Sequence, residues 1–158
     1  MSTTTPASVS VAERLQVRVT QPDAHRGALA LTGAIGRSGL ETSLIDLIDV
    51  RVSQINGCAF CIQMHTQEAR EHGETDARLH ALSAWEEASV FTARERVGLA
   101  LAEAITLLQA GHVSNAVWEE ATARFSESEL AAIVLVSSIM NFWNRVSIAS
   151  RSTPGAPA

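Results

Sequence analysis

Two cysteines and a histidine with short spacings are the residues of this sequence best suited to chemistry. They form Cys58-x-x-Cys61-x-x-x-His65, and the chain has no other cysteine. Residues three or four positions apart are neighbours on a helix, so Cys58 and Cys61 can form a disulfide and His65 can reach the Cys61 thiol. The segment therefore supplies a nucleophile, a base and a second thiol that can resolve an oxidised first one.

Two other interpretations of this segment stay open at the level of sequence. The cysteines and the histidine could simply fill a core, because free cysteine is among the most buried residue types. Two thiolates and an imidazole could also bind zinc, with His72 or an aspartate as a fourth ligand, although structural zinc sites usually draw ligand pairs from separate segments. Covalent haem attachment does not fit, since Ile62 and not a histidine follows the second cysteine.

The segment is expected to lie on a helix that begins near Cys58, runs to His72 and stops at Gly73. A helical projection places both cysteines, His65 and His72 on one face, which predicts that all four point inward. Both cysteines then lie in the first turn, where free backbone N–H groups and the helix dipole lower the pKa of a thiol. A thiolate at neutral pH becomes plausible there.

Helix start and stop signals recur along the rest of the chain, and no stretch alternates like a convincing strand. Capping-box patterns occur at Thr92 to Glu95 and at Ser126 to Glu129. The sequence predicts an all-α protein with about six to eight helices. The clearest are expected near residues 22–35, 42–55, 58–72, 92–110, 114–125 and 127–149.

Length and composition indicate one folded domain. The chain has 158 residues, of which 46% are hydrophobic and 18% charged, enough apolar content for a core at this size. Both ends are rich in Ser, Thr, Pro or Ala and lack large apolar residues. We expect flexible tails at 1–15 and 151–158 around a domain at 16–150.

Charge and hydropathy argue against several classes of partner. The net charge is −5, and the 12 arginines are scattered among 17 acidic residues, so nucleic acid is not an expected partner. Residues 1–10 resemble no secretory signal, which predicts a cytoplasmic protein. The longest apolar stretch, 130–140, is well short of the ~18 residues that a membrane span needs, so no membrane association is expected.

Residues 51–73, RVSQINGCAFCIQMHTQEAREHG, closely resemble the core of the AhpD-like, carboxymuconolactone decarboxylase family. The resemblance extends through Trp85 and residues 91–96 to residues 141–145, and so covers most of 20–150. It implies an AhpD-like helical bundle that assembles as a homo-oligomer, commonly a trimer or hexamer.

The resemblance also implies roles for individual residues. Cys61 would attack a peroxide, Cys58 would resolve the product as a disulfide, and His65 would relay protons from an acidic residue twelve positions before the first cysteine. That position holds Asp46, one methylene shorter than the family's glutamate. Phe60 stands where the best-studied peroxidases of the family carry a histidine.

Helix geometry alone would not single out Asp46. With Asp49 and Ser53 it forms a polar stripe opposite the apolar face of its helix, and such a stripe is more often a solvated surface. Three other histidines are assigned to surface or packing positions: His25, His80 and His112. Three polar residues near the end of the last long helix could line a subunit contact or the site mouth, or simply be solvated: Asn141, Asn144 and Arg145.

The leading hypothesis is an antioxidant oxidoreductase that reduces alkyl hydroperoxides through a Cys58–Cys61 dithiol cycle, with no cofactor. Resemblance implies a dithiol electron donor of the lipoyl or thioredoxin-like type. One alternative is lactone decarboxylase or isomerase chemistry with Asp46 and His65 as acid and base. Another is a non-enzymatic protein whose dithiol only changes its packing or assembly.

Overall fold

The computed structural model describes residues 12–152, and these form eight α-helices, two short 3-10 helices and no strand. The all-α prediction and the predicted helix number are confirmed. The predicted tails at 1–15 and 151–158 fall mostly outside the described residues. The elements in chain order are α1 (Val17–Thr20), α2 (Pro22–Ile35), α3 (Thr42–Asn56), α4 (Ala59–Glu71), α5 (Asp76–Ala81), η1 (Leu82–Ala84), α6 (Ala93–Thr106), η2 (Leu108–Ala110), α7 (Asn115–Thr122) and α8 (Glu127–Ser150).

Side-chain caps start most of the longer helices. Thr92 and Ser126 each accept a hydrogen bond from the backbone N–H three residues on, and Glu95 and Glu129 return one, so both predicted capping boxes are present. These bonds satisfy backbone N–H groups that have no partner inside the helix. The cap positions explain why the sequence predicts the starts of α6 and α8 to within a residue.

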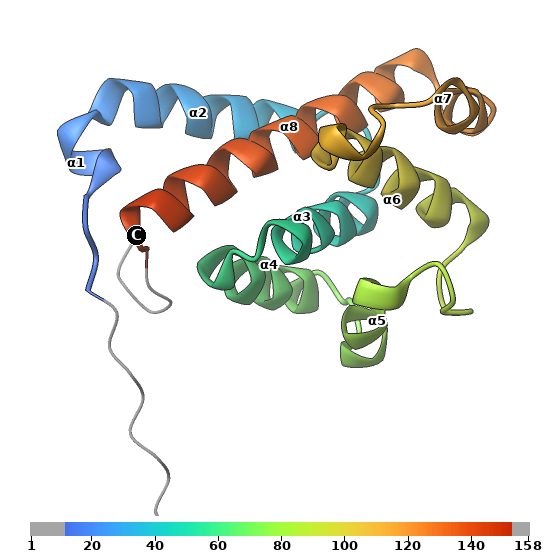
Figure 1. Cartoon of the computed structure of the whole chain (residues 1–158), viewed down its shortest axis with the longest axis horizontal. Helices are drawn as coiled ribbons and strands as arrows, with labels where there is room; N and C mark the ends of the chain where they lie inside the picture. Colours follow the sequence, from blue (N-terminus) through green and yellow to red (C-terminus); the bar gives the residue numbers. More distant parts are fainter. Residues whose placement is uncertain (1–11, 153–158) are drawn as a thin grey trace, which may run out of the picture.

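Helix α3 lies at the centre of the fold and packs against α4, α6 and α8, while α2 runs beside α8 (Figure 1). Its side chains enter two hydrophobic clusters. Ile48 and Val52 face the cluster shared with α8, and Leu47 and Val50 face the cluster that includes α5 and the following turn. All four are 0–1% exposed, and burying each contributes about 1.5–3 kcal/mol. Ala69 of α4 belongs to the second cluster, which therefore holds α4 against α3.

Gly98 lets α6 approach α3 closely. A Cβ atom at this position would lie 3.1 Å from both methyl carbons of the Leu44 side chain. Contacts that short force the neighbouring side chain to move, and Leu44 is itself 2% exposed. The missing side chain of Gly98 thus sets the spacing between α6 and the start of α3.

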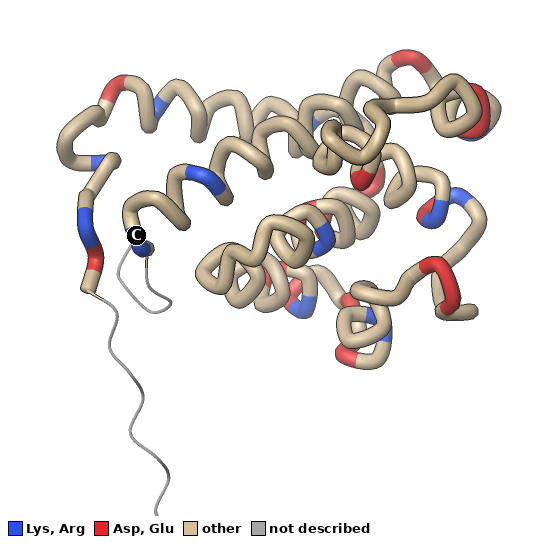
Figure 2. Tube along the Cα trace, in the orientation of Figure 1, with Lys and Arg blue, Asp and Glu red and all other residues tan. Residues whose placement is uncertain are grey.

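Arginines and acidic residues alternate over the surface of the described chain, and the arginines gather on no single face (Figure 2). Several are paired with carboxylates: Arg51 with Glu103, and Arg94 with Glu41 and Glu129. These pairs agree with the scattered charge of the sequence. The absence of a nucleic-acid partner stays a prediction.

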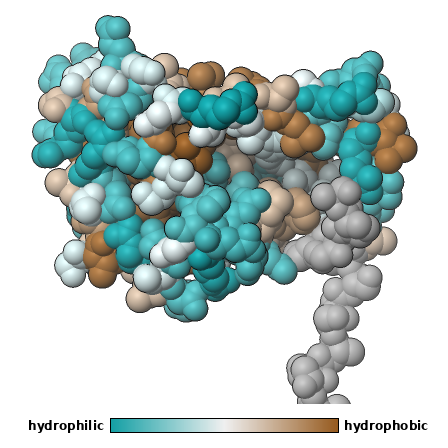
Figure 3. Space-filling view, turned by 180° about the vertical axis from the view of Figure 1, so that it is seen from behind, coloured by the Kyte–Doolittle hydropathy of each residue, from teal (hydrophilic) through white to brown (hydrophobic). Residues whose placement is uncertain are grey.

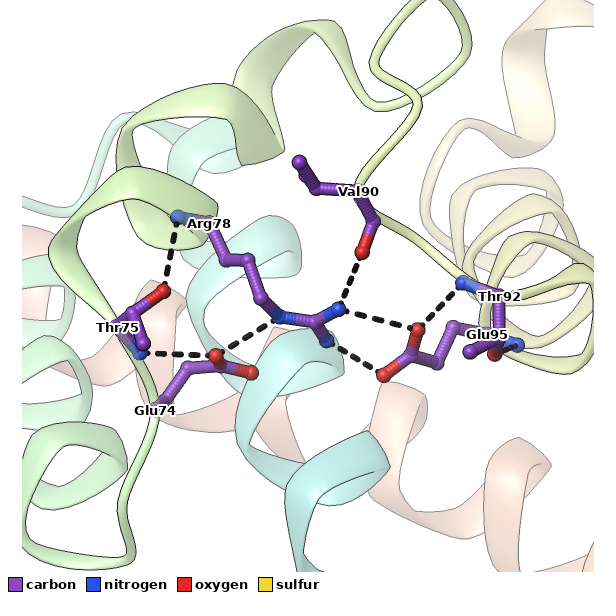
Figure 4. A network of polar contacts seen from close by, with 6 residues as sticks. All are labelled: Glu74, Thr75, Arg78, Val90, Thr92 and Glu95. Carbon is purple, nitrogen blue, oxygen red and sulfur yellow. Dashed lines mark hydrogen bonds and ion pairs between the residues drawn. The ribbon is translucent and has the colours of Figure 1, made fainter.

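An arginine network joins the segment after α4 to the start of α6 (Figure 4). The Arg78 guanidinium donates to Glu74 at 2.8 Å and pairs with Glu95, whose carboxylate also accepts the N–H of Thr92 at 2.7 Å. The N–H of Thr75 donates to Glu74 at 2.9 Å. These contacts fix the chain directly beyond α4, the helix that carries the candidate site.

Helix α8 is long and apolar enough, by those two criteria alone, to cross a membrane. Half of its most apolar window is buried within the fold, and core helices of soluble proteins pass the same test. Ile133 and Met140, at 0% and 1% exposure, belong to the main hydrophobic cluster. The sequence-based expectation of a buried helix here is confirmed, while the cytoplasmic location stays a prediction.

Candidate active site

The two cysteines lie where α3 gives way to α4. Gly57 ends α3 in the left-handed backbone region at φ 69°, and Cys58 then caps α4, its sulfur accepting the N–H of Cys61 at 3.3 Å. A disulfide joins Cys58 and Cys61, whose Cα atoms are 5.3 Å apart, and each residue is 1% exposed. The pair therefore sits at the amino end of a helix, sheltered from solvent.

His65 lies one helical turn after Cys61 and is held by carboxylates. Its Nδ1 is 2.8 Å from Glu68 Oε2 on the same helix and 3.9 Å from Asp49 Oδ2 on α3. The His65 side chain is 12% exposed. Its Nε2 is buried and has no hydrogen-bond partner within residues 12–152. A ring nitrogen thus remains available to exchange a proton.

Burial and pairing shift the pKa values of His65, Glu68 and Asp49. Burial raises the pKa of Asp49 to about 7, because its charged form loses water. Burial opposes the charged form of His65, but the hydrogen bond with Glu68 and the charge of Asp49 outweigh it and raise the pKa of His65. The same hydrogen bond lowers the pKa of Glu68. The charged imidazole of His65 therefore persists to higher pH than that of an ordinary histidine.

Asp46 is buried at 7% exposure, but its direct partner is His72 and not His65. Asp46 Oδ2 lies 2.8 Å from His72 Nδ1, and the His72 side chain is 51% exposed. Burial raises the pKa of Asp46 and the pairing with His72 opposes that rise. The hydrogen bond with Asp46 raises the pKa of His72. The charge of Asp46 still reaches His65 through space.

Two expectations about these residues are wrong. His72 does not point into the core, because α4 ends at Glu71 and His72 is its C-cap, where a helical projection no longer applies.

The polar stripe of α3 is not a solvated surface. Asp46 and Ser53 are buried and the Asp49 side chain is 14% exposed, because α4 and α8 pack over this side of α3.

Sequence reasoning missed Glu68 and Asp49 as partners of His65. Glu68 follows His65 by three residues, a spacing at which helical side chains meet. Asp49 is three residues after Asp46 on the same stripe. The signal available for Glu68 was its spacing of three from His65 on α4, and the signal for Asp49 was its spacing of three from Asp46 on α3.

Three asparagines, two of them buried, form a network that ties the end of α3 to α8. The Asn56 amide donates to the side-chain oxygens of Asn141 at 3.0 Å and Asn144 at 2.8 Å, and the Asn144 amide donates to Ser53 at 3.0 Å. Asn144 is 0% exposed and Asn141 9%. The alternative that Asn141 and Asn144 are simply solvated near the end of the last helix is therefore wrong. The network anchors the turn that presents Cys58.

Replacing Asn144 with leucine is expected to lower the free energy of unfolding by about 1–3 kcal/mol. The change removes one of the two acceptors of the Asn56 amide and the N–H that donates to the buried Ser53 hydroxyl. Urea unfolding measures the loss. The exposed Asn115→Leu variant is the control and should stay within about 0.5 kcal/mol of the parent. Equal effects of the two changes would contradict a structural role for the network.

Zinc binding gains no support from the arrangement. Across residues 12–152, no group of three or more His, Cys, Asp or Glu side chains is placed to hold a metal ion. The two sulfurs that would provide thiolate ligands are joined to each other.

A model of the carboxymuconolactone decarboxylase family matches residues 22–104, just over half of the chain. The chain belongs to this family. The match contains α3, α4 and most of α6, so this family member carries its disulfide, His65 and both acidic positions of α3 inside the matched region. The resemblance expected from the sequence is confirmed.

Relatives of this family member support the same grouping. The uncharacterised protein YdfG of Bacillus subtilis is 40% identical over 113 residues, which are 72% of this chain and 77% of YdfG. The alkyl hydroperoxide reductase AhpD of Hyphomonas neptunium is 40% identical over 47 residues, 30% of this chain and 26% of that protein. The shorter match thus covers less than a third of either protein.

The fold of this family member also matches a solved structure. A protein of unknown function from Agrobacterium tumefaciens, assigned provisionally to antioxidant defence as AhpD, superposes with a TM-score of 0.88. It is 33% identical, and the match covers 92% of this chain and 100% of that one. The family is enzymatic, and its AhpD-like helical fold is the fold of this chain.

Proposed function

We propose that the protein is a thiol-dependent peroxidase that reduces alkyl hydroperoxides through a Cys58–Cys61 dithiol and disulfide cycle. The observation that carries the proposal is the buried Cys58–Cys61 disulfide at the amino end of α4, one turn before a histidine held by carboxylates. A helix N-terminus favours a thiolate, and a charged imidazole nearby favours it further. Family membership and the Agrobacterium structure support an antioxidant role.

In the first step, the Cys61 thiolate forms a bond to the outer peroxide oxygen as the O–O bond breaks. The sulfur is oxidised to a sulfenic acid and the peroxide is reduced to an alcohol. The departing alkoxide takes a proton from His65, whose charged form the neighbouring carboxylates favour. A neutral alcohol therefore leaves.

In the second step, the Cys58 thiol attacks the sulfur of the sulfenic acid. A disulfide forms, and the hydroxyl group takes the thiol proton and leaves as water. One turn of helix brings the two sulfurs within bonding distance, as the disulfide of the structure illustrates. A donor dithiol then returns both cysteines to thiols and is itself oxidised to a disulfide.

The burial of the disulfide limits the size of the electron donor that can reach it. Both cysteines are 1% exposed in the folded chain. A slender dithiol on a flexible arm, of the lipoyl type, can reach such a site with less local opening than a globular, thioredoxin-like protein needs. We therefore favour a lipoyl-type donor.

Assembly into a homo-oligomer, a trimer or hexamer, is part of the proposal. Large apolar side chains on α2 and α8 are exposed in the single chain, among them Leu29, Leu135 and Phe142. The rear view shows apolar surface interrupting the hydrophilic surface along the molecule (Figure 3). Exposed apolar surface of this kind is typical of protein contacts.

A turnover assay tests the proposal against lactone chemistry. The reduced protein is supplied with cumene hydroperoxide and dihydrolipoamide, and peroxide loss is followed. The proposal predicts turnover that needs both compounds. Lactone decarboxylation that survives replacement of both cysteines by serine, together with no peroxide loss, would instead favour acid–base chemistry by Asp46 and His65.

A further inference from the structure

Three carboxyl groups act electrostatically on the imidazole of His65, and they are not equivalent. Glu68 and Asp49 both approach His65 Nδ1, at 2.8 and 3.9 Å. Asp46 Oδ2 instead pairs with His72 Nδ1 at 2.8 Å. We propose that Asp49, and not Asp46, is the residue of α3 that positions and charges His65. The inference rests on the proposed function, in which His65 delivers the proton.

Asp49 is better placed than Glu68 to influence the charge of His65. The Glu68 side chain is 48% exposed and belongs to the same helix as His65, while the Asp49 side chain is 14% exposed and comes from the facing helix. Charges out of water interact more strongly than exposed ones, which solvent and salt screen. A carboxyl on α3 also fixes the imidazole relative to the neighbouring helix.

One oxygen of Asp49 is unused. Asp49 Oδ1 is buried and accepts no hydrogen bond from residues 12–152, and the same holds for His65 Nε2. At 3.9 Å the Asp49–His65 contact is longer than a hydrogen bond, so it is electrostatic in this form. Asp49 Oδ1 and His65 Nε2 are therefore both free to bind a proton.

Asp46 and His72 form a separate couple nearer to solvent. The His72 side chain is 51% exposed and caps the end of α4. Engaging Asp46 there leaves the His65 ring to Asp49 and Glu68. Asp46, the aspartate at the position of the family's glutamate, thus pairs with His72 and not with His65 in this chain.

The proposal gives a proton balance. When the alkoxide takes the proton of His65, the neutral imidazole takes up another proton from solvent, and the negative charge of Asp49 favours that uptake. Burial raises the pKa of Asp49 to about 7, so its carboxyl group gains this charge as the pH rises through that value. The charged groups that act on this pair come from both helices: Asp46 on α3 and Glu68 on α4. His72, directly after α4, acts on Asp46, and Glu71 acts on His72.

Matched amide variants in the full-length oxidised protein test the pairing. Imidazole titrations of His65 and His72 are followed by NMR in Asp49→Asn and Asp46→Asn. We expect a crossed pattern: Asp49→Asn lowers the pKa of His65 more than Asp46→Asn does, and only Asp46→Asn clearly lowers that of His72. General destabilisation would not produce such a crossed result. Asp49→Glu, which keeps a carboxyl group, is expected to restore the His65 titration.

A kinetic arm uses the reduced protein and one equivalent of cumene hydroperoxide. Asp49→Asn should slow thiol loss at least about fivefold more than Asp46→Asn and move the alkaline decline of the rate to lower pH. A larger effect of Asp46→Asn on His65, in either arm, would overturn the inference. If the parent consumes no peroxide but the crossed titration holds, the proposed function fails while the pairing stands.

Discussion

Replacing Cys61 with serine is expected to reduce the rate of peroxide consumption by at least about a thousandfold. A serine hydroxyl stays protonated at neutral pH, whereas a thiol at a helix N-terminus beside a charged imidazole readily becomes the nucleophilic thiolate. Serine differs from cysteine by one atom, so the buried first turn of α4 should keep its packing. Loss of cumene hydroperoxide in the presence of the reduced protein is the measurement.

Cys58→Ser is the matched control, the same change three residues earlier and at the same 1% exposure. This variant should still consume one equivalent of peroxide and then stop, because no thiol is left to resolve the sulfenic acid. Dimedone should label Cys61, as peptide mass spectrometry would show. If Cys58→Ser loses the first reaction while Cys61→Ser keeps it, the two roles are reversed.

The second large effect is expected from His65→Gln, which should slow peroxide reduction about 10²- to 10⁴-fold. Glutamine can still form hydrogen bonds with Glu68, but it cannot deliver a proton to the leaving alkoxide or support the thiolate with its charge. Rapid-mixing measurements of thiol loss compare the variant with His80→Gln, a change at an exposed histidine. Equal rates in the two variants would remove His65 from the mechanism.

The pH dependence gives His65 a signature of its own. The pKa of His65 is raised, so its charged form persists above the ordinary value near 6.5 and is lost as the pH rises through the shifted value. The rate of the parent should fall in that alkaline range. His65→Gln should lack this decline, because no imidazole titrates there. A decline of equal size in both proteins would assign it to another group.

Local sequence signals were enough to predict the longer helices. Thr92 and Ser126 start α6 and α8 as capping boxes, and Gly57 ends α3, because each satisfies backbone groups through residues next to it in the chain. The cysteine pair was predictable for the same reason, since its geometry depends on one helical turn.

Contacts between helices were harder to predict. Whether His65 meets Asp46 or Asp49 depends on how α4 crosses α3, and a shift of one turn exchanges the two. His72 was misplaced because a projection cannot tell where the helix ends. Asn56 and Asn144 are 88 residues apart, so their burial depends on tertiary packing that no local pattern records.

The most direct test of the central claim is a single-turnover thiol count. The reduced full-length protein is mixed with one equivalent of cumene hydroperoxide at neutral pH, free thiols are counted, and the product is mapped by mass spectrometry. The account predicts rapid loss of both thiols, one equivalent of alcohol and a Cys58–Cys61 disulfide. Persistence of both thiols for minutes would mean that Cys61 is not an activated nucleophile and would contradict the peroxidase function.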